Sequence, residues 1–360
     1  MTPTHGRGLL HLAAAVDHEA AYDGGRHVES ARLAERGGLD FVTLGDSSGR
    51  PGPDALAVLS RVATATTRIG LVPTVTTTRT DPFRVQAALA TLDWVSRGRA
   101  GWWIDVSPTE DESRPSGRAT APPAAELWRS AGEVADAAAS LWDGREDGAE
   151  ILDAVGARRV DRGTPHPADH TGTGFPVRGP SRVPRPPQGH PVRLVDATEE
   201  PARAVAARCA DVALVRAADP ERARAARQRL RAAAAESGRD PDGLRVLTSL
   251  LVDLGDGERA AERGHGGGGP RQTARGPLYR GGPVDLAELI ARWHTAGAVD
   301  GFHLVPVEPC RDLERLVNGT VALLQHRGLF RTFYPGSTLR EHLALPRPAN
   351  RYAATADGTP

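Results

Sequence analysis

The stretch from residue 68 to residue 107 constrains the fold of this chain more than any other. It begins with an apolar run rich in β-forming residues, Ile69 to Val75, which predicts a buried strand. Pro82, tolerated in the first turn of a helix, opens a segment whose apolar side chains recur at helical spacing. Gly98 stands where a helix favours a left-handed terminal residue, and a second strand, 100–106, follows at once. Strand, helix and strand with short links form a βαβ unit, which belongs to a parallel sheet.

The same alternation of strands and helices continues on both sides of this unit. Further strands are predicted at residues 9–16, 39–45, 191–195, 212–215, 244–254 and 301–305, and further helices at 27–36, 54–65, 124–142, 201–209, 220–237 and 283–296. These make about eight strand–helix units, so we predict an α/β fold, a (β/α)8 TIM barrel with insertions.

We expect a single barrel domain over residues 1–348, followed by a C-terminal tail at 349–360. Three excursions from the barrel are predicted where Pro, Gly and polar residues interrupt the periodicity, at about 108–123, 143–190 and 255–282. A structureless link as long as 143–190 is unusual inside a compact domain, and we expect this segment to fold over one end of the barrel.

The overall charge and the cysteine content exclude several classes of function. The chain carries 45 Lys+Arg and 45 Asp+Glu, a formal net charge of zero, which favours neither nucleic acid nor an anionic membrane surface. It has no apolar run of roughly 18 residues and no signal-peptide pattern. Its two cysteines form neither a disulfide framework nor a metal-ligand pattern. We therefore expect a cytoplasmic protein with no metal site, no nucleic-acid partner and no membrane partner.

In a barrel of this type the working residues lie where the strands end, at the C-terminal face. The positions that this rule nominates are Asp46–Ser47, Thr74, 76–78, 105–107, 196–198 and 305–308. They should converge on one mouth, but their positions do not identify a catalytic residue. The chain has no G-x-G-x-x-G fingerprint, so we do not expect it to bind NAD(P)H in the manner of a dinucleotide-binding fold.

Four phrases in the sequence resemble a known family of enzymes. They are DPFRVQAALATLDWVSRGRAGWWIDVS at 81–107, AELWRSAGEVADAAASLWDGREDGA at 125–149, DHTGTGFPVRGPSRVPRPPQGHPV at 169–192 and LLQHRGLFRTFYPGSTLREHLALPRP at 323–348. Their residue patterns and their order along the chain are similar to those of the bacterial-luciferase-like flavin-dependent monooxygenases. The resemblance is to the branch of nitrilotriacetate, pristinamycin IIA and dibenzothiophene-sulfone monooxygenases, and it implies a barrel with insertions.

The resemblance also implies an activity. In this family a separate NAD(P)H:flavin reductase delivers reduced FMN as a co-substrate. O₂ then adds at the flavin C4a, and the hydroperoxide oxygenates a small organic substrate. The protein holds the flavin, excludes water and steers the substrate. Barrels of this family often dimerise, so the resemblance is also compatible with a homodimer.

The residues expected to bind the flavin follow from the same resemblance. Asp46, Thr74 and Ser107 keep the family's residue types at strand ends. Trp103 stands where the family has Asn, and Trp128 where it has Tyr. Both tryptophans would shape the flavin pocket, although packing in the core explains them equally well.

The family's phosphate-binding phrase is altered at residues 196–202. Its glycines are absent, and Glu199 and Glu200 stand where a phosphate dianion would lie. Like charges there oppose phosphate, and the open glycine backbone is lost. Thr198 keeps a hydroxyl that can donate to the flavin phosphate.

This departure leaves two alternatives to the flavin-dependent monooxygenase. One is a barrel that has lost flavin and serves as a non-catalytic subunit or binding protein. The other is an oxidoreductase that uses the deazaflavin F420, as relatives in this superfamily do.

Overall fold

The structure is a computed structural model. It describes residues 8–18, 22–45, 52–78, 80–107, 122–145, 147, 150–153, 158–161, 166, 168–171, 176–179, 181–255 and 269–353. The predicted site residue Asp46 lies outside the described residues, as do most of the 108–123 excursion and the end of the C-terminal tail.

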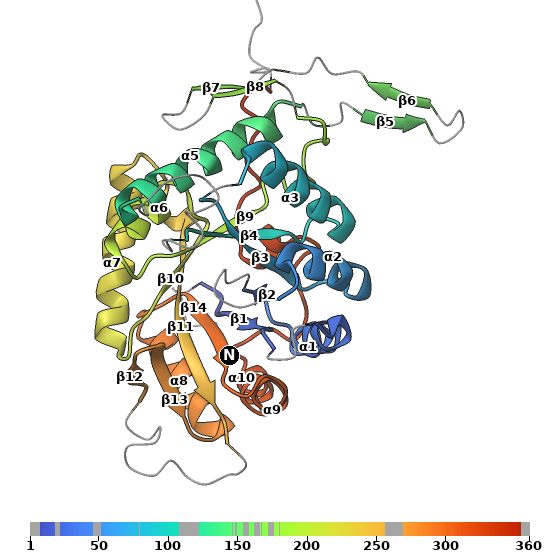
Figure 1. The fold of residues 1–360 in the computed structure, drawn as a ribbon. Helices are drawn as coiled ribbons and strands as arrows, with labels where there is room; N and C mark the ends of the chain where they lie inside the picture. Colours follow the sequence, from blue (N-terminus) through green and yellow to red (C-terminus); the bar gives the residue numbers. More distant parts are fainter. Residues whose placement is uncertain are drawn as a thin grey trace, which may run out of the picture.

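Eight parallel strands form a closed barrel at the centre of the molecule (Figure 1). They are β1 (His11–Ala15), β2 (Phe41–Leu44), β3 (Gly70–Thr76), β4 (Gly101–Asp105), β9 (Val192–Asp196), β10 (Val212–Val215), β11 (Arg245–Asp253) and β14 (Gly301–Pro306). Each strand pairs in parallel with the next one along the chain, and β14 pairs with β1 to close the ring. The predicted (β/α)8 barrel is therefore confirmed.

Helices cover the outside of the barrel (Figure 1). They are α1 (Gly24–Arg36), α2 (Ala55–Ala65), α3 (Pro82–Ser96), α5 (Ala124–Asp143), α6 (Glu200–Cys209), α7 (Pro220–Glu236), α8 (Pro283–Thr295), α9 (Pro309–Arg315) and α10 (Ala322–His326). A π-helical segment, Leu316–Val321, joins the last two, and a 3-10 turn, Pro241–Gly243, precedes β11. None of the described helices is both long enough and apolar enough to cross a bilayer.

Helix α1 begins three residues earlier than predicted. Asp23 caps it, because its side chain accepts a hydrogen bond from the backbone N–H of Gly25. At the end of α3 the left-handed conformation begins one residue before the predicted position, at Arg97 with φ 59°. Gly98 follows with φ 86° and donates its N–H to the Asp93 carbonyl. The helix end that was predicted at Gly98 is therefore formed by two left-handed residues, Arg97 and Gly98.

The excursions contain short antiparallel hairpins. The segment 143–190 holds two of them, β5 (Glu150–Asp153) with β6 (Arg158–Asp161) and β7 (Ala168–Thr171) with β8 (Pro176–Gly179). Both lie to the side of the barrel, beyond α5, and not over one end as expected (Figure 1). In the third excursion, β12 (Arg271–Thr273) and β13 (Gly276–Arg280) pair next to the far end of β11.

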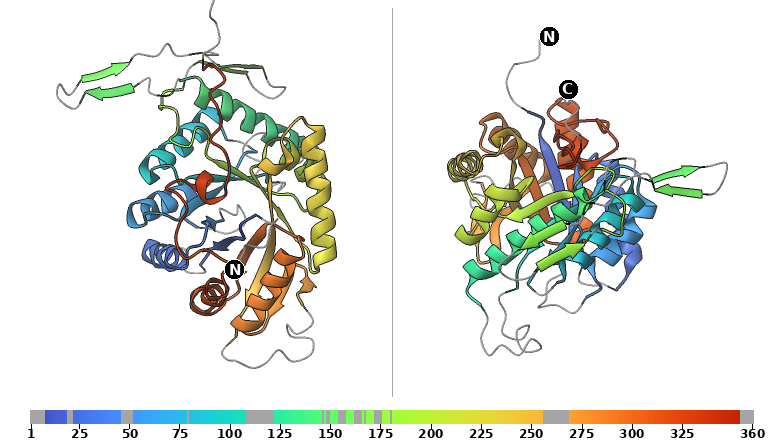
Figure 2. Two further views of the ribbon diagram at one scale, coloured as in Figure 1. Left: turned by 180° about the vertical axis from the view of Figure 1, so that it is seen from behind. Right: turned by 90° about the horizontal axis from the view of Figure 1, so that it is seen from above.

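The C-terminal segment closes the end of the barrel at which the strands begin (Figure 2). Leu339 in helix α11 (Leu339–His342), together with Leu343 and Leu345, packs into a cluster with buried strand residues such as Phe41. Next to Leu339, the guanidinium of Arg340 forms a buried ion pair of 3.0 Å with the Asp211 carboxylate. This closure leaves the opposite end, where the strands terminate, as the open mouth.

Candidate active site

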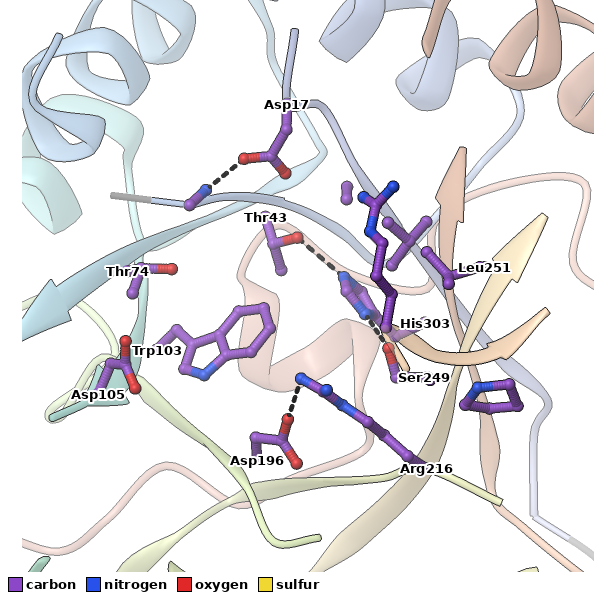
Figure 3. A pocket seen from close by; sticks show the side chains of 16 residues that line it. Asp17, Thr43, Thr74, Trp103, Asp105, Asp196, Arg216, Ser249, Leu251 and His303 are labelled. Carbon is purple, nitrogen blue, oxygen red and sulfur yellow. Dashed lines mark hydrogen bonds and ion pairs between the residues drawn. The ribbon is translucent and has the colours of Figure 1, made fainter. Parts of the chain in front are cut away.

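A cavity of about 330 Å³ opens at the mouth where the barrel strands end (Figure 3). This volume lies within the roughly 300–1,000 Å³ of small-molecule sites. The lining residues come from nearly every strand of the barrel: Ala15, Asp17, Thr43, Gly45, Thr74, Trp103, Asp105, Asp196, Arg216, Ser249, Leu251, Arg275, Gly276, Pro277, His303 and Val305. The cavity therefore lies at the end of the barrel that the strand-end rule nominates.

Strand register places four polar residues side by side on one half of the cavity. Asp196 in β9 pairs with Leu214 in β10, and Arg216 follows Leu214 by two residues. Val215 pairs with Thr248 across β10 and β11, so the next residues, Arg216 and Ser249, are neighbours. Ser249 in turn pairs with His303 across β11 and β14. We call Asp196, Arg216, Ser249 and His303 the polar arc.

His303 lies at the centre of a chain of hydrogen bonds. Its Nε2 lies 2.8 Å from the Thr43 hydroxyl and its Nδ1 lies 3.1 Å from the Ser249 hydroxyl (Figure 3). Burial, with a smaller contribution from the Arg216 guanidinium, lowers the pKa of His303 to about 3. The imidazole is therefore neutral at physiological pH, so it donates one hydrogen bond and accepts the other.

Arg216 reaches into the cavity from the end of β10. Its Nη2 lies 2.8 Å from a carboxylate oxygen of Asp196 (Figure 3). The other oxygen of Asp196 accepts two hydrogen bonds from Thr198, 2.6 Å from the hydroxyl and 3.1 Å from the backbone N–H. Thr198 thus fixes the carboxylate that orients the guanidinium.

An aromatic side chain on β4 also lines the cavity. Trp103 faces the cavity and meets His303 edge to face, with 5.6 Å between ring centroids (Figure 3). Its neighbour across β3 and β4 is Thr74, which also lines the cavity. Leu251 and Val305, two residues beyond Ser249 and His303 on the same strands, supply apolar surface next to the polar arc. The cavity therefore combines a flat aromatic wall with a polar arc that contains one guanidinium.

Two of the predicted site residues, Thr74 and Trp103, line this cavity together. The other described ones do not line it. Ser107 is buried just past β4 and donates its backbone N–H to the Thr78 hydroxyl at 2.8 Å. Trp128 packs against the hydrophobic cluster that α5 shares with α6. The hydroxyl of Thr198 binds Asp196, so in this structure it does not point to a separate phosphate site. Their predicted contacts with flavin stay predictions.

Sequence reasoning missed Arg216, Ser249 and His303. Strand alternation could have found His303, because Phe302 and Leu304 on either side of it belong to the core beneath the helices. In a barrel strand the residue between two such positions faces the interior. A polar side chain at an inward position near the end of a strand is therefore a usable signal.

Comparison with known proteins shows the family to which the chain belongs. The sequence model of the family described as luciferase-like monooxygenase matches residues 3–303. The chain is 30% identical over 412 residues to nitrilotriacetate monooxygenase component A of Aminobacter aminovorans, with 91% of each chain covered. It is 30% identical over 400 residues to N-acetyl-S-(2-succino)cysteine monooxygenase of Bacillus subtilis (strain 168), with 90% of each covered.

A solved structure of similar fold is the EDTA monooxygenase from Chelativorans sp. BNC1. The TM-score is 0.83 at 23% sequence identity, covering 94% of this chain and 99% of that one. At this identity the likeness shows the shared barrel. The family model and the two related monooxygenases agree with the family resemblance of the four sequence segments quoted above.

Proposed function

Because the chain belongs to the luciferase-like monooxygenase family and is thus an oxidoreductase, we propose that it is a two-component flavin-dependent monooxygenase. It receives reduced FMN from a separate NAD(P)H:flavin reductase and uses O₂ to oxygenate a small organic substrate. The observation that carries this proposal is the cavity at the barrel mouth, with the Trp103 wall on one side and the polar arc on the other.

The cavity has the features that a flavin ring requires. An isoalloxazine ring is flat and largely apolar, with hydrogen-bonding groups along one edge. The Trp103 indole, Leu251 and Val305 offer apolar surface, while Arg216 and Ser249 offer polar groups on one side. When bound, reduced FMN supplies the electrons that activate O₂, and the protein supplies orientation and a site shielded from water.

The start of α6 offers few groups that could bind the flavin phosphate. Glu199 occupies the N-cap without a side-chain capping bond, and Glu200 and Pro201 begin the helix. A proline has no N–H to donate, and the two carboxylates oppose the anion that a helix N-terminus otherwise attracts. Arg203 forms an ion pair with Glu200, so this cation is already engaged. The first turn of α6 therefore does not suit a phosphate dianion.

We place the phosphate instead at the rim of the cavity, next to Arg275. This exposed residue lines the cavity from the turn between β12 and β13. The turn is held by the Thr273 hydroxyl, which donates to the Gly276 carbonyl at 2.6 Å and accepts the N–H of Arg275 at 3.2 Å. An arginine at this point offers a fork of N–H donors suited to phosphate oxygens.

Binding of FMN and riboflavin tests this placement, because riboflavin lacks the phosphate. The wild type should bind FMN more tightly than riboflavin. Arg275→Gln should reduce that preference by about tenfold, since a hydrogen-bonded charge contributes roughly 1.5–3 kcal/mol and solvent weakens an exposed one. Arg271→Gln, an exposed arginine in β12 of the same hairpin, is the matched control and should keep the preference. An unchanged preference in Arg275→Gln would place the phosphate elsewhere.

A further inference from the structure

We infer that Trp103 limits the depth of the cavity and thereby restricts it to compact substrates. The inference rests on the proposed function, because it names the size class of substrate that the same cavity admits. The indole of Trp103 is the wall between the cavity and the apolar interior of the barrel. A ligand that enters from the mouth meets this ring and cannot reach the interior behind it.

Trp103 contacts both the cavity and the core of the barrel. It lines the cavity, and its partly buried side chain also packs against an apolar cluster that includes Phe41, Leu194 and Leu339. Within the described ranges of the chain, Trp103 is the one residue that belongs to both sets. The cluster extends to Leu339 of α11 at the closed end. The indole therefore separates the open mouth from a continuous apolar interior.

The indole reaches toward the far side of the barrel. Trp103 is on β4 and His303 is on β14, which lies four strands from β4 in either direction around the ring of eight. Strands at this separation face each other across the barrel. The two rings nevertheless meet edge to face, with 5.6 Å between their centroids and 86° between their planes (Figure 3). Together they bridge the interior from one wall to the other.

Both ends of this bridge are fixed. The Nε2 of His303 lies 2.8 Å from the Thr43 hydroxyl and its Nδ1 lies 3.1 Å from the Ser249 hydroxyl, so the imidazole cannot turn without losing a hydrogen bond. At the other end, β4 is paired on both sides, with β3 and with β9. The backbone from which the indole projects is therefore held in place, and the wall is rigid.

A rigid wall at this depth determines how large a ligand can be. The cavity bounded by the described residues holds about 330 Å³. This is near the lower end of the roughly 300–1,000 Å³ of small-molecule sites. In the proposed reaction the flavin ring and the substrate share this space. A compact molecule fits there, whereas a long alkyl chain needs the apolar interior that the indole closes off.

Binding of primary alcohols of increasing chain length tests this depth limit without a flavin. Each methylene that enters an apolar environment favours binding about fourfold. Calorimetric titrations with 1-butanol, 1-hexanol and 1-octanol compare the wild type with Trp103→Ala. In the wild type the affinity should stop rising along the series. In Trp103→Ala, which opens the interior, it should keep rising, so that this variant binds 1-octanol at least tenfold more tightly than the wild type.

Two further variants keep the comparison interpretable. Trp103→Phe retains an aromatic ring on the apolar cluster, so it tests the wall even if the alanine variant does not fold. It should bind 1-octanol about fourfold more tightly than the wild type, the effect of one methylene. Trp94→Ala is the matched control, because Trp94 is 48% exposed and lies on α3. Its loss should leave the dependence on chain length unchanged.

The outcomes separate the inference from the proposed function. If the affinity of the wild type itself rises about fourfold per methylene up to 1-octanol, Trp103 does not limit the cavity, and the inference is wrong while the monooxygenase proposal stands. An equal gain in Trp94→Ala and Trp103→Ala would also contradict the inference. If the alcohols behave as expected but the wild type does not bind reduced FMN, the proposed function fails and the depth limit stands.

Discussion

The neutral state of His303 has a measurable consequence for stability. The pKa of His303 is lowered from 6.5 to about 3 in the folded protein, first by burial and then by Arg216. The unfolded chain therefore binds a proton at this residue below about pH 6.5, while the folded protein does not. A state that binds more protons gains as the pH falls, so acid favours unfolding. On account of His303 alone, the free energy of unfolding should fall by about 2 kcal/mol between about pH 7 and about pH 5.

The assay is urea unfolding at several values across this pH range, on the wild type and on His303→Gln. Other histidines with lowered pKa values, such as His342 and His190, are present in both proteins and cancel in the difference. The variant should be less stable at neutral pH, because the chain through Thr43 and Ser249 is altered. It should lose about 2 kcal/mol less than the wild type on acidification.

Thr43→Val is the control for the lost hydrogen bond. It removes the 2.8 Å contact with Nε2 but keeps the imidazole, so its stability should run below that of the wild type with a similar dependence on pH. If the wild type and His303→Gln show the same dependence on pH, the buried imidazole takes up a proton in the folded protein. The assignment of a neutral imidazole to the folded protein would then be wrong.

Three further predictions concern the cofactor site and the closed end of the barrel. Thr74→Phe should weaken the binding of reduced FMN at least tenfold, because Thr74 lines the cavity, and titration of this variant against the wild type checks the placement. Glu199→Ser combined with Glu200→Gly should leave FMN affinity nearly unchanged, because the phosphate is placed at Arg275, and tighter binding would return the phosphate to α6. Leu339→Ala should destabilise the protein by about 2–5 kcal/mol, since it empties a fully buried position in the cluster that closes the barrel, and a loss below about 1 kcal/mol in the free energy of unfolding by urea would contradict that packing.

The fold was predictable because the alternation of strands and helices is strong along this chain. Strands buried on both sides read as continuous apolar runs, and Ile69 to Val75 is one of them. The position of the excursion at 143–190 was not predictable in the same way. Its β7–β8 hairpin lies against α5 and its β5–β6 hairpin stands farther out (Figure 1), and hairpins of about four residues a strand carry too little periodicity to show what they pack against.

The site was predictable in part. Thr74 and Trp103 follow from the strand-end rule and the family phrases, and both line the cavity. Trp128 belongs to a helix, and only the packing of α5 on α6 shows that it lies in the outer layer. Arg216 directly follows the strand Val212–Val215, and only the pairing of this strand with β11 shows that its side chain reaches the cavity. His303 and Ser249 become a pair only through the register of β11 with β14, which no single strand reveals.

The central claim is that this barrel binds reduced FMN. The measurement that tests it most directly is an anaerobic titration of the purified protein with reduced FMN, with F420 in parallel. The account predicts saturable binding of reduced FMN with a Kd in the micromolar range, about −8 kcal/mol, and weaker binding of F420. Binding of F420 alone would assign the barrel to deazaflavin chemistry, and binding of neither would contradict a flavin-dependent monooxygenase.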